Sequence, residues 1–154
     1  MKCKELHYTN SIHYELEQTA KLMRILTAQL FEKLEIRISQ DEYAALDTIS
    51  INPGICQRDL AKLIIKDRAN TGRILNCLEE KNLVTRVIDT KDNRLVKKLE
   101  ITQDGIKELN SINIKIKSYM DNVTKKIAPE EVDRVQEILR GFRLDLEKVV
   151  EMNI

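Results

Sequence analysis

Residues 56–102 read CQRDLAKLIIKDRANTGRILNCLEEKNLVTRVIDTKDNRLVKKLEIT. Two short helical patterns, at about 57–65 and 68–81, are separated by a polar break at Lys66-Asp67. A strand-like run over 83–88, a charged turn over 89–94 and a second strand-like run over 95–101 follow. The order helix, turn, helix, hairpin predicts a winged helix-turn-helix, which presents one helix and one basic loop to DNA together.

The flanking segments are expected to be helical. Apolar residues spaced by three, four and seven predict a helix over about 11–36, and a long helix is expected over 103–127. A capping box from Ser39 to Glu42 starts a helix that Asn52-Pro53-Gly54 ends, and Pro129 opens the last helix. The expected fold is mainly α with a small β-hairpin, in a single domain of 154 residues. Its winged helix-turn-helix lobe spans about 39–102, and helical regions span 1–36 and 103–154.

The composition supports this reading and bounds the function. Gly (4) and Pro (2) are few, which favours long helices, and the net charge is only +1. Residues 56–98, however, carry eleven Lys and Arg against six Asp and Glu, a net of +5, so the basic charge lies where DNA would bind. No apolar run approaches the roughly 18 residues that span a bilayer, and no secretory signal is visible. A reducing cytoplasm is the simplest expectation for the three unevenly spaced cysteines.

The last helix carries apolar residues with 3-4 spacing, which is typical of a coiled-coil seam. Its members are Val132, Val135, Leu139, Phe142, Leu146 and Val149. The small lobe does not need these terminal helices for its own core. They are interpreted as a dimerisation platform, because half-site recognition favours two-fold symmetry; the alternative is a monomeric bundle.

The second helix of the motif carries side chains suited to the major groove. Arginine binds guanine O6 and N7 through two hydrogen bonds, and asparagine binds adenine N6 and N7 in the same way. The alternative, judged without the wing, is an ordinary solvated helix face. Ile74, Leu75 and Leu78 are expected to point inward. The residues predicted to contact DNA are Gln57, Arg68, Asn70, Arg73 and Asn76, together with Lys91, Asn93 and Arg94 of the wing.

In the wing, Arg94 is expected to enter a narrow minor groove, with Asp92 holding its guanidinium group. The alternative is a charged turn that only keeps the hairpin solvated.

The sequence resembles that of the MarR family (multiple antibiotic resistance regulators). The resemblance rests on Leu60-Ala61, the helix from Asp67 to Leu78, the run LVTR at 83–86, the wing DTKDNR at 89–94 and TQDG at 102–105. It implies a homodimeric transcription regulator, usually a repressor, with the second helix of the motif in the major groove and Arg94 in the minor groove. It also implies release of DNA by a small aromatic or phenolic compound. Residues suggested for that pocket, which are equally good core residues, are Met23, Leu26, Tyr43 and Ile116.

The chain departs from the family pattern at four positions. Asn82 replaces a Gly, Thr90 replaces a Pro, and Cys56 and Ala128 lack the capping oxygen of the usual Ser or Thr. Each lost cap is worth roughly 1 kcal/mol.

Other functions have weaker support. A redox switch at Cys3 or Cys77 would need a depressed thiol pKa, which sequence does not reveal, and plain thiols are the simpler interpretation. The two histidines, His7 and His13, are not spaced as a metal pair, and no catalytic motif is present, so we expect no metal, no cofactor and no enzyme activity. The rival from a different class is a helical protein-interaction module that does not bind DNA.

Overall fold

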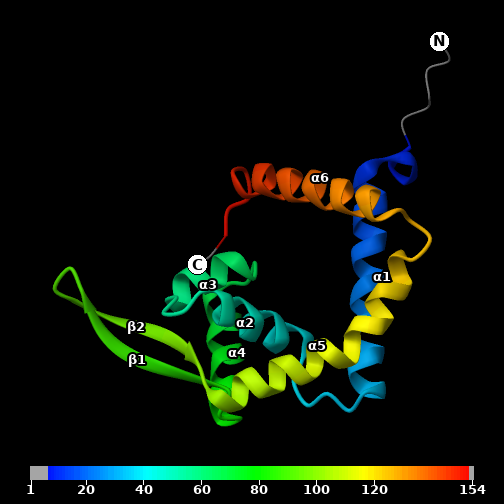
Figure 1. Cartoon of the computed structure of the whole chain (residues 1–154). Helices are drawn as coiled ribbons and strands as arrows, with labels where there is room; N and C mark the ends of the chain where they lie inside the picture. Colours follow the sequence, from blue (N-terminus) through cyan, green and yellow to red (C-terminus); the bar gives the residue numbers. More distant parts are fainter. Residues whose placement is uncertain (1–6, 153–154) are drawn as a thin grey trace. The chain divides into compact units, whose positions relative to one another are not determined.

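The computed structural model describes residues 7–152, which fall into two compact units, one up to Gln40 and one from Asp41. The chain is mainly helical with one two-stranded antiparallel sheet, so the predicted fold class is confirmed. In chain order the elements are η1 (Tyr8–Asn10), α1 (Ile12–Lys33), α2 (Gln40–Ile51), α3 (Gln57–Leu63), α4 (Arg68–Glu80), β1 (Val84–Lys91), β2 (Arg94–Ile101), α5 (Gln103–Thr124) and α6 (Pro129–Glu147) (Figure 1).

The first unit is built on α1. The Ser11 hydroxyl caps this helix by accepting a hydrogen bond from the backbone N–H of Tyr14 at 3.2 Å. The helix ends at Lys33 rather than near residue 36, because Glu35 takes a left-handed backbone conformation with φ of 52°. A helix does not continue through such a residue.

The second unit has one hydrophobic core to which α2, α3, α4, β2 and α5 all contribute. Its fully buried leucines and isoleucines are Leu46, Ile49, Leu60, Leu75, Leu78, Leu99 and Ile112. The predicted inner face of α4 needs one correction, because Ile74 is only half-buried while Thr71 is fully buried. The Thr71 hydroxyl tolerates burial because it donates a hydrogen bond to the Asp67 carbonyl at 2.8 Å.

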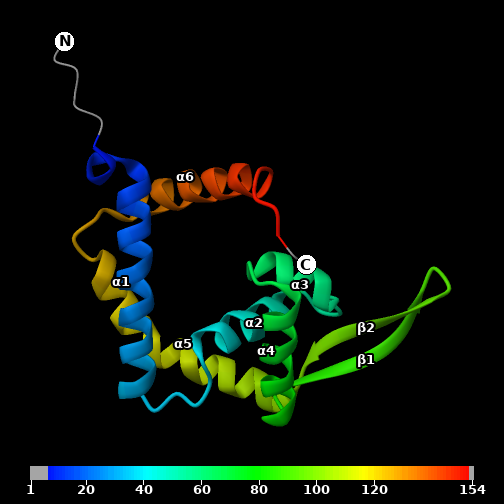
Figure 2. The ribbon, with the colours of Figure 1, turned by 180° about the vertical axis from the view of Figure 1, so that it is seen from behind.

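The hairpin extends away from the helices of its unit (Figures 1 and 2). Its strands pair from Val84 with Ile101 to Lys91 with Arg94, so the turn holds only two residues, Asp92 and Asn93. The sequence predicted a longer turn, over 89–94. Both turn residues have positive φ, 51° and 60°, and two consecutive left-handed residues match the twist of paired strands.

The T-x-x-G motif joins the hairpin to α5. The Thr102 hydroxyl accepts from the backbone N–H of Gly105 at 2.9 Å, which caps α5 as expected, and it donates to the Asn82 carbonyl at 2.7 Å. The Thr102 N–H donates to the Leu83 carbonyl at 3.0 Å. Asn82 itself has φ of 57° and ends α4, so asparagine performs the role usually given to glycine here.

Gly105 is required at this junction by space rather than by backbone angle. A Cβ at Gly105 would lie 2.2 Å from the Leu83 carbonyl oxygen and 2.7 Å from Cγ1 of Ile101. Both separations are far below van der Waals contact, and one involves backbone that cannot rotate away.

We therefore expect Gly105→Ala to lower the free energy of unfolding by roughly 1–3 kcal/mol or more, through overpacking. Urea denaturation followed by circular dichroism measures the change. Gly141→Ala is the matched control, because a Cβ at Gly141 meets nothing within 4 Å. In a helix interior that change should stabilise by about 0.5–1 kcal/mol. Equal effects of the two substitutions would contradict the assigned role of Gly105.

The last helix, α6, contains no buried residue. Three of its predicted seam residues, Val135, Leu139 and Leu146, are exposed by 52%, 41% and 43%. These three seam residues are therefore largely uncovered by the described part of the chain, while Val132 and Phe142 are half-buried. Within residues 7–152, no helix is long and apolar enough to cross a membrane.

Candidate DNA-binding surface

Helix α4 is anchored to the start of α2 at both of its ends. Lys66, just before α4, forms an ion pair with Asp41 at 2.9 Å, and Lys81, just after α4, forms one with Glu42 at 2.6 Å. Glu42 is only 8% exposed, so it is a buried charge that has a partner. We call these two ion pairs the α4 anchors. They tie the orientation of α4 to a single turn of α2.

The N-terminus of α4 is capped by Asp67, as predicted. One Asp67 carboxylate oxygen accepts from the backbone N–H of Asn70 at 2.7 Å, and the other accepts from the Asn70 side-chain amide at 2.6 Å. These two hydrogen bonds, the backbone one first, hold the pKa of Asp67 below its usual value, because they favour the ionised carboxylate.

The outer face of α4 collects most of the residues predicted to contact DNA. Arg68, Arg73 and Asn76 are exposed, and Asn70 is half-buried. Gln57 of α3 lies beside the same face, since a Cβ at Gly72 would be 3.5 Å from its Nε2 atom. Three of these side chains are already engaged: Arg73 donates to the Asn70 amide oxygen, and Asn76 accepts from Arg86.

Arg86, on β1, belongs to the LVTR run of the family resemblance, but the sequence predicted no role for its side chain. Its NH1 group donates to the Asn76 amide oxygen at 3.0 Å and to the Glu79 carboxylate at 2.6 Å. Its Nε atom is buried without a hydrogen-bond partner in the described residues. Arg86 therefore attaches the base of the wing to α4. Helical periodicity gives no signal for such a contact, because Arg86 lies on β1 and both of its partners lie on α4.

At the tip of the wing, Lys91 and Arg94 face each other as the last strand pair, and both are exposed. Asn93 and Asp92 form the turn between them. No hydrogen bond or ion pair joins Asp92 to Arg94 in the described residues, so support of Arg94 by Asp92 stays a prediction. The wing carboxylate that forms an ion pair is Asp89, which accepts from Lys98. That hydrogen bond is the main cause of the lowered pKa of Asp89.

The residues suggested for an effector pocket fall in both units. Met23 and Leu26 belong to α1, while Tyr43 and Ile116 belong to the second unit, so a shared pocket stays a prediction. Within the second unit, the Tyr43 hydroxyl contacts Oδ1 of Asn113 at 2.6 Å, and burial raises the Tyr43 pKa.

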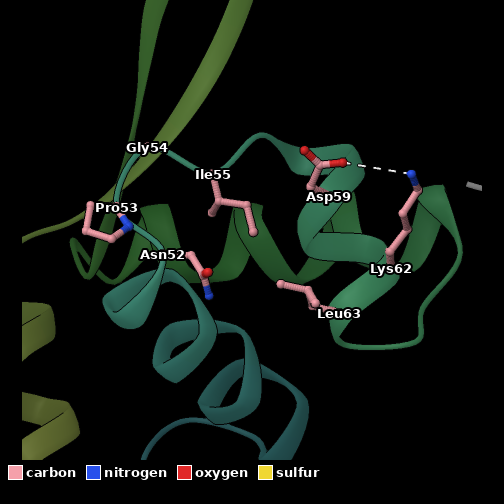
Figure 3. Close-up of a pocket in the computed structure, with 7 residues that line it drawn as sticks. All are labelled: Asn52, Pro53, Gly54, Ile55, Asp59, Lys62 and Leu63. Carbon is pink, nitrogen blue, oxygen red and sulfur yellow. Dashed lines mark ion pairs between the residues drawn. The ribbon is translucent and has the colours of Figure 1, made fainter. Parts of the chain in front are cut away.

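A pocket on the lobe lies between the end of α2 and α3 (Figure 3). Its lining contains none of the suggested effector residues and no aromatic ring; it consists of Asn52, Pro53, Gly54, Ile55, Asp59, Lys62 and Leu63.

The cysteines give little support to a redox switch. Cys77 is half-buried on α4, and Cys3 lies outside the described residues. Cys56 stands at the N-cap of α3 without a side-chain cap hydrogen bond, as its lost oxygen predicted, and its sulfur is 3.3 Å from Asp59. Ala128 likewise leaves α6 without a side-chain cap.

The fold and this surface define a winged helix-turn-helix protein, and comparison with known proteins shows which proteins it is similar to. The MarR family model matches residues 38–96. The HTH-type transcriptional regulator YybA of Bacillus subtilis (strain 168) is 25% identical over 139 residues, covering 90% of this chain and 91% of that protein. The family model thus covers the winged helix-turn-helix lobe, and the resemblance to the MarR family predicted from the sequence is confirmed for that lobe.

Solved structures show the same fold. A complex of Staphylococcus aureus MepR with DNA has a TM-score of 0.73 at 20% identity, covering 91% of this chain and 99% of that one. NadR in complex with 4-hydroxyphenylacetate has a TM-score of 0.75 at 20% identity, covering 95% and 99%.

The lowered pKa of Asp67 predicts a pH-dependent stability. A folded-state pKa below the unfolded value contributes stability that is present above the unfolded pKa and is lost as the pH falls through the folded pKa. Asp67→Asn keeps a capping oxygen but removes the charge. The free energy of unfolding of the wild type minus that of the variant should therefore be larger at pH 7 than near about pH 3. Thermal melts at both pH values measure it, and a difference that stays constant would contradict the assignment.

Proposed function

We propose that the protein is a homodimeric repressor that binds a pseudo-palindromic operator. Helix α4 of each protomer enters the major groove, and Arg94 of each wing enters the adjacent minor groove. The observation that carries this proposal is the placement of exposed Arg68 and Arg73 on the outer face of a helix whose two ends are anchored. The DNA complex of MepR, which shares the fold, supports the same use of the lobe.

The exposed apolar seam of α6 supports the homodimer. Val135, Leu139 and Leu146 follow coiled-coil spacing and remain exposed in the single chain. A second copy of the chain presents the same seam, so a two-fold interface would bury both. Paired lobes would then read two half-sites about one DNA turn apart.

Arg94→Ala should weaken operator binding by about 1–2 kcal/mol and make the dependence of log affinity on log salt shallower, because the guanidinium group contacts DNA. Fluorescence anisotropy with a duplex from upstream of the gene, over a salt series, measures both quantities. Stoichiometric titration should give two chains per operator.

Arg140→Ala is the matched control for this experiment. Arg140 is an exposed arginine of α6, outside the winged helix-turn-helix lobe, and its loss should leave both quantities unchanged. Unchanged affinity and slope for Arg94→Ala would overturn the role of the wing. A wild-type protein that shows no preference for upstream DNA over random DNA, with a flat salt response, would favour a protein-interaction module instead.

We further propose that a small phenolic or aromatic acid releases the protein from DNA. The complex of NadR with 4-hydroxyphenylacetate supports this class of ligand. A ligand present at 100 times its Kd should stabilise the folded protein by about 2.7 kcal/mol.

The expected result is a higher melting temperature with 4-hydroxyphenylacetate or a related acid, and loss of the anisotropy signal at the same concentration. Cyclohexylacetate, which has no aromatic ring, is the control. The absence of any shift across a panel of aromatic acids would contradict the proposed effector class.

A further inference from the structure

Both asparagines on the outer face of α4 have their amide oxygen occupied by an arginine. The Asn70 oxygen accepts from Arg73, and the Asn76 oxygen accepts from Arg86. Reading adenine requires the amide oxygen to accept from N6 and the amide nitrogen to donate to N7 at the same time. In this structure the amide oxygens of Asn70 and Asn76 both point to a cation of the protein itself.

Asn70 links Asp67 to Arg73 through two side-chain hydrogen bonds. Its amide nitrogen donates to the Asp67 carboxylate at 2.6 Å, and its amide oxygen accepts from Arg73. The amide orientation is fixed by these two partners, because the flipped amide would place its oxygen against a carboxylate and its NH₂ group against a guanidinium group. This series of hydrogen bonds begins at the helix cap, where the Asn70 backbone N–H also donates to Asp67.

These hydrogen bonds restrain Arg73, which is one of the exposed side chains of the surface. A free arginine side chain loses much rotational entropy when it is ordered on DNA. Arg73 has one of its donors bound to Asn70, and a guanidinium group has five N–H donors, so the remaining ones are available to an acceptor in the groove. The two acceptors of a guanine, O6 and N7, match that fork.

We propose that Asn70 is a positioning residue that orients Arg73 for a guanine in each half-site, and that it does not itself read adenine. This inference rests on the proposed DNA binding. Asn76 differs, because its arginine partner comes from β1 and also binds Glu79, so Asn76 acts on the attachment of the wing.

The test is a double-mutant cycle on operator DNA with Asn70→Ala, Arg73→Ala and the double variant. Asn70→Ala should lower the preference for operator over random DNA by about tenfold, from the entropy of an unrestrained arginine. In the Arg73→Ala background the same change should have no further effect. Asn70→Ala keeps the backbone N–H that Asp67 caps, and circular dichroism checks that the variant is folded.

Asn76→Ala is the matched control, an asparagine on the same helix face that does not contact Arg73. Its effect should add to that of Arg73→Ala. A second readout replaces each guanine of the half-site in turn by 7-deazaguanine, which lacks the N7 acceptor. One replacement should weaken wild-type binding by about tenfold and have a smaller effect on Asn70→Ala.

The outcomes separate the two proposals. Additive effects of Asn70→Ala and Arg73→Ala would overturn the positioning role while leaving DNA binding intact. The same holds for a 7-deazaadenine replacement that weakens wild-type binding but has a smaller effect on Asn70→Ala. A wild-type protein without preference for any upstream duplex would overturn the proposed function and this inference with it. Non-additive effects together with the guanine response support the inference.

Discussion

The backbone carbonyl of Leu83 is the point on which the arrangement of the lobe depends. It accepts the N–H of Thr102 at 3.0 Å, and it occupies the space that a Cβ at Gly105 would need. The Leu83 N–H is in turn bound by the Leu78 carbonyl at the end of α4, at 2.9 Å. The end of α4, the base of the wing and the start of α5 therefore meet at Leu83. Their relative positions are set by backbone atoms and depend little on side-chain rotamers.

Much of this fold could be predicted from the sequence because its signals are local. The caps Asp67 and Thr102, and the asparagine that ends α4, act through neighbours within a few residues. The outer face of α4 follows from helical periodicity for the same reason. The inner face of α4, which depends on tertiary packing, was predicted less accurately: Thr71 is buried there in place of Ile74.

The missed features depend on partners that are distant in sequence. Nothing in the spacing of Glu42 and Lys81 indicates that they meet, since 39 residues separate them. The same holds for Arg86, whose partners on α4 are known only once the hairpin is placed beside that helix. The two-residue turn was missed because Asp-Asn is a weaker signal for consecutive left-handed residues than Asn-Gly or Asp-Gly. The net charge of +5 over residues 56–98 also overstated the free basic charge, because Lys66 and Lys81 form ion pairs with Asp41 and Glu42, which lie outside that range.

The α4 anchors have a mechanical consequence. Asp41 and Glu42 are consecutive residues, and they are the first two of the second unit, directly after the boundary at Gln40. Both ion pairs end on consecutive residues of α2. A small displacement of the first turn of α2 therefore moves both ends of α4 in the same direction. The helix then translates as a rod and does not pivot about one end. A shift of that kind would change the depth of every side chain on its outer face at once.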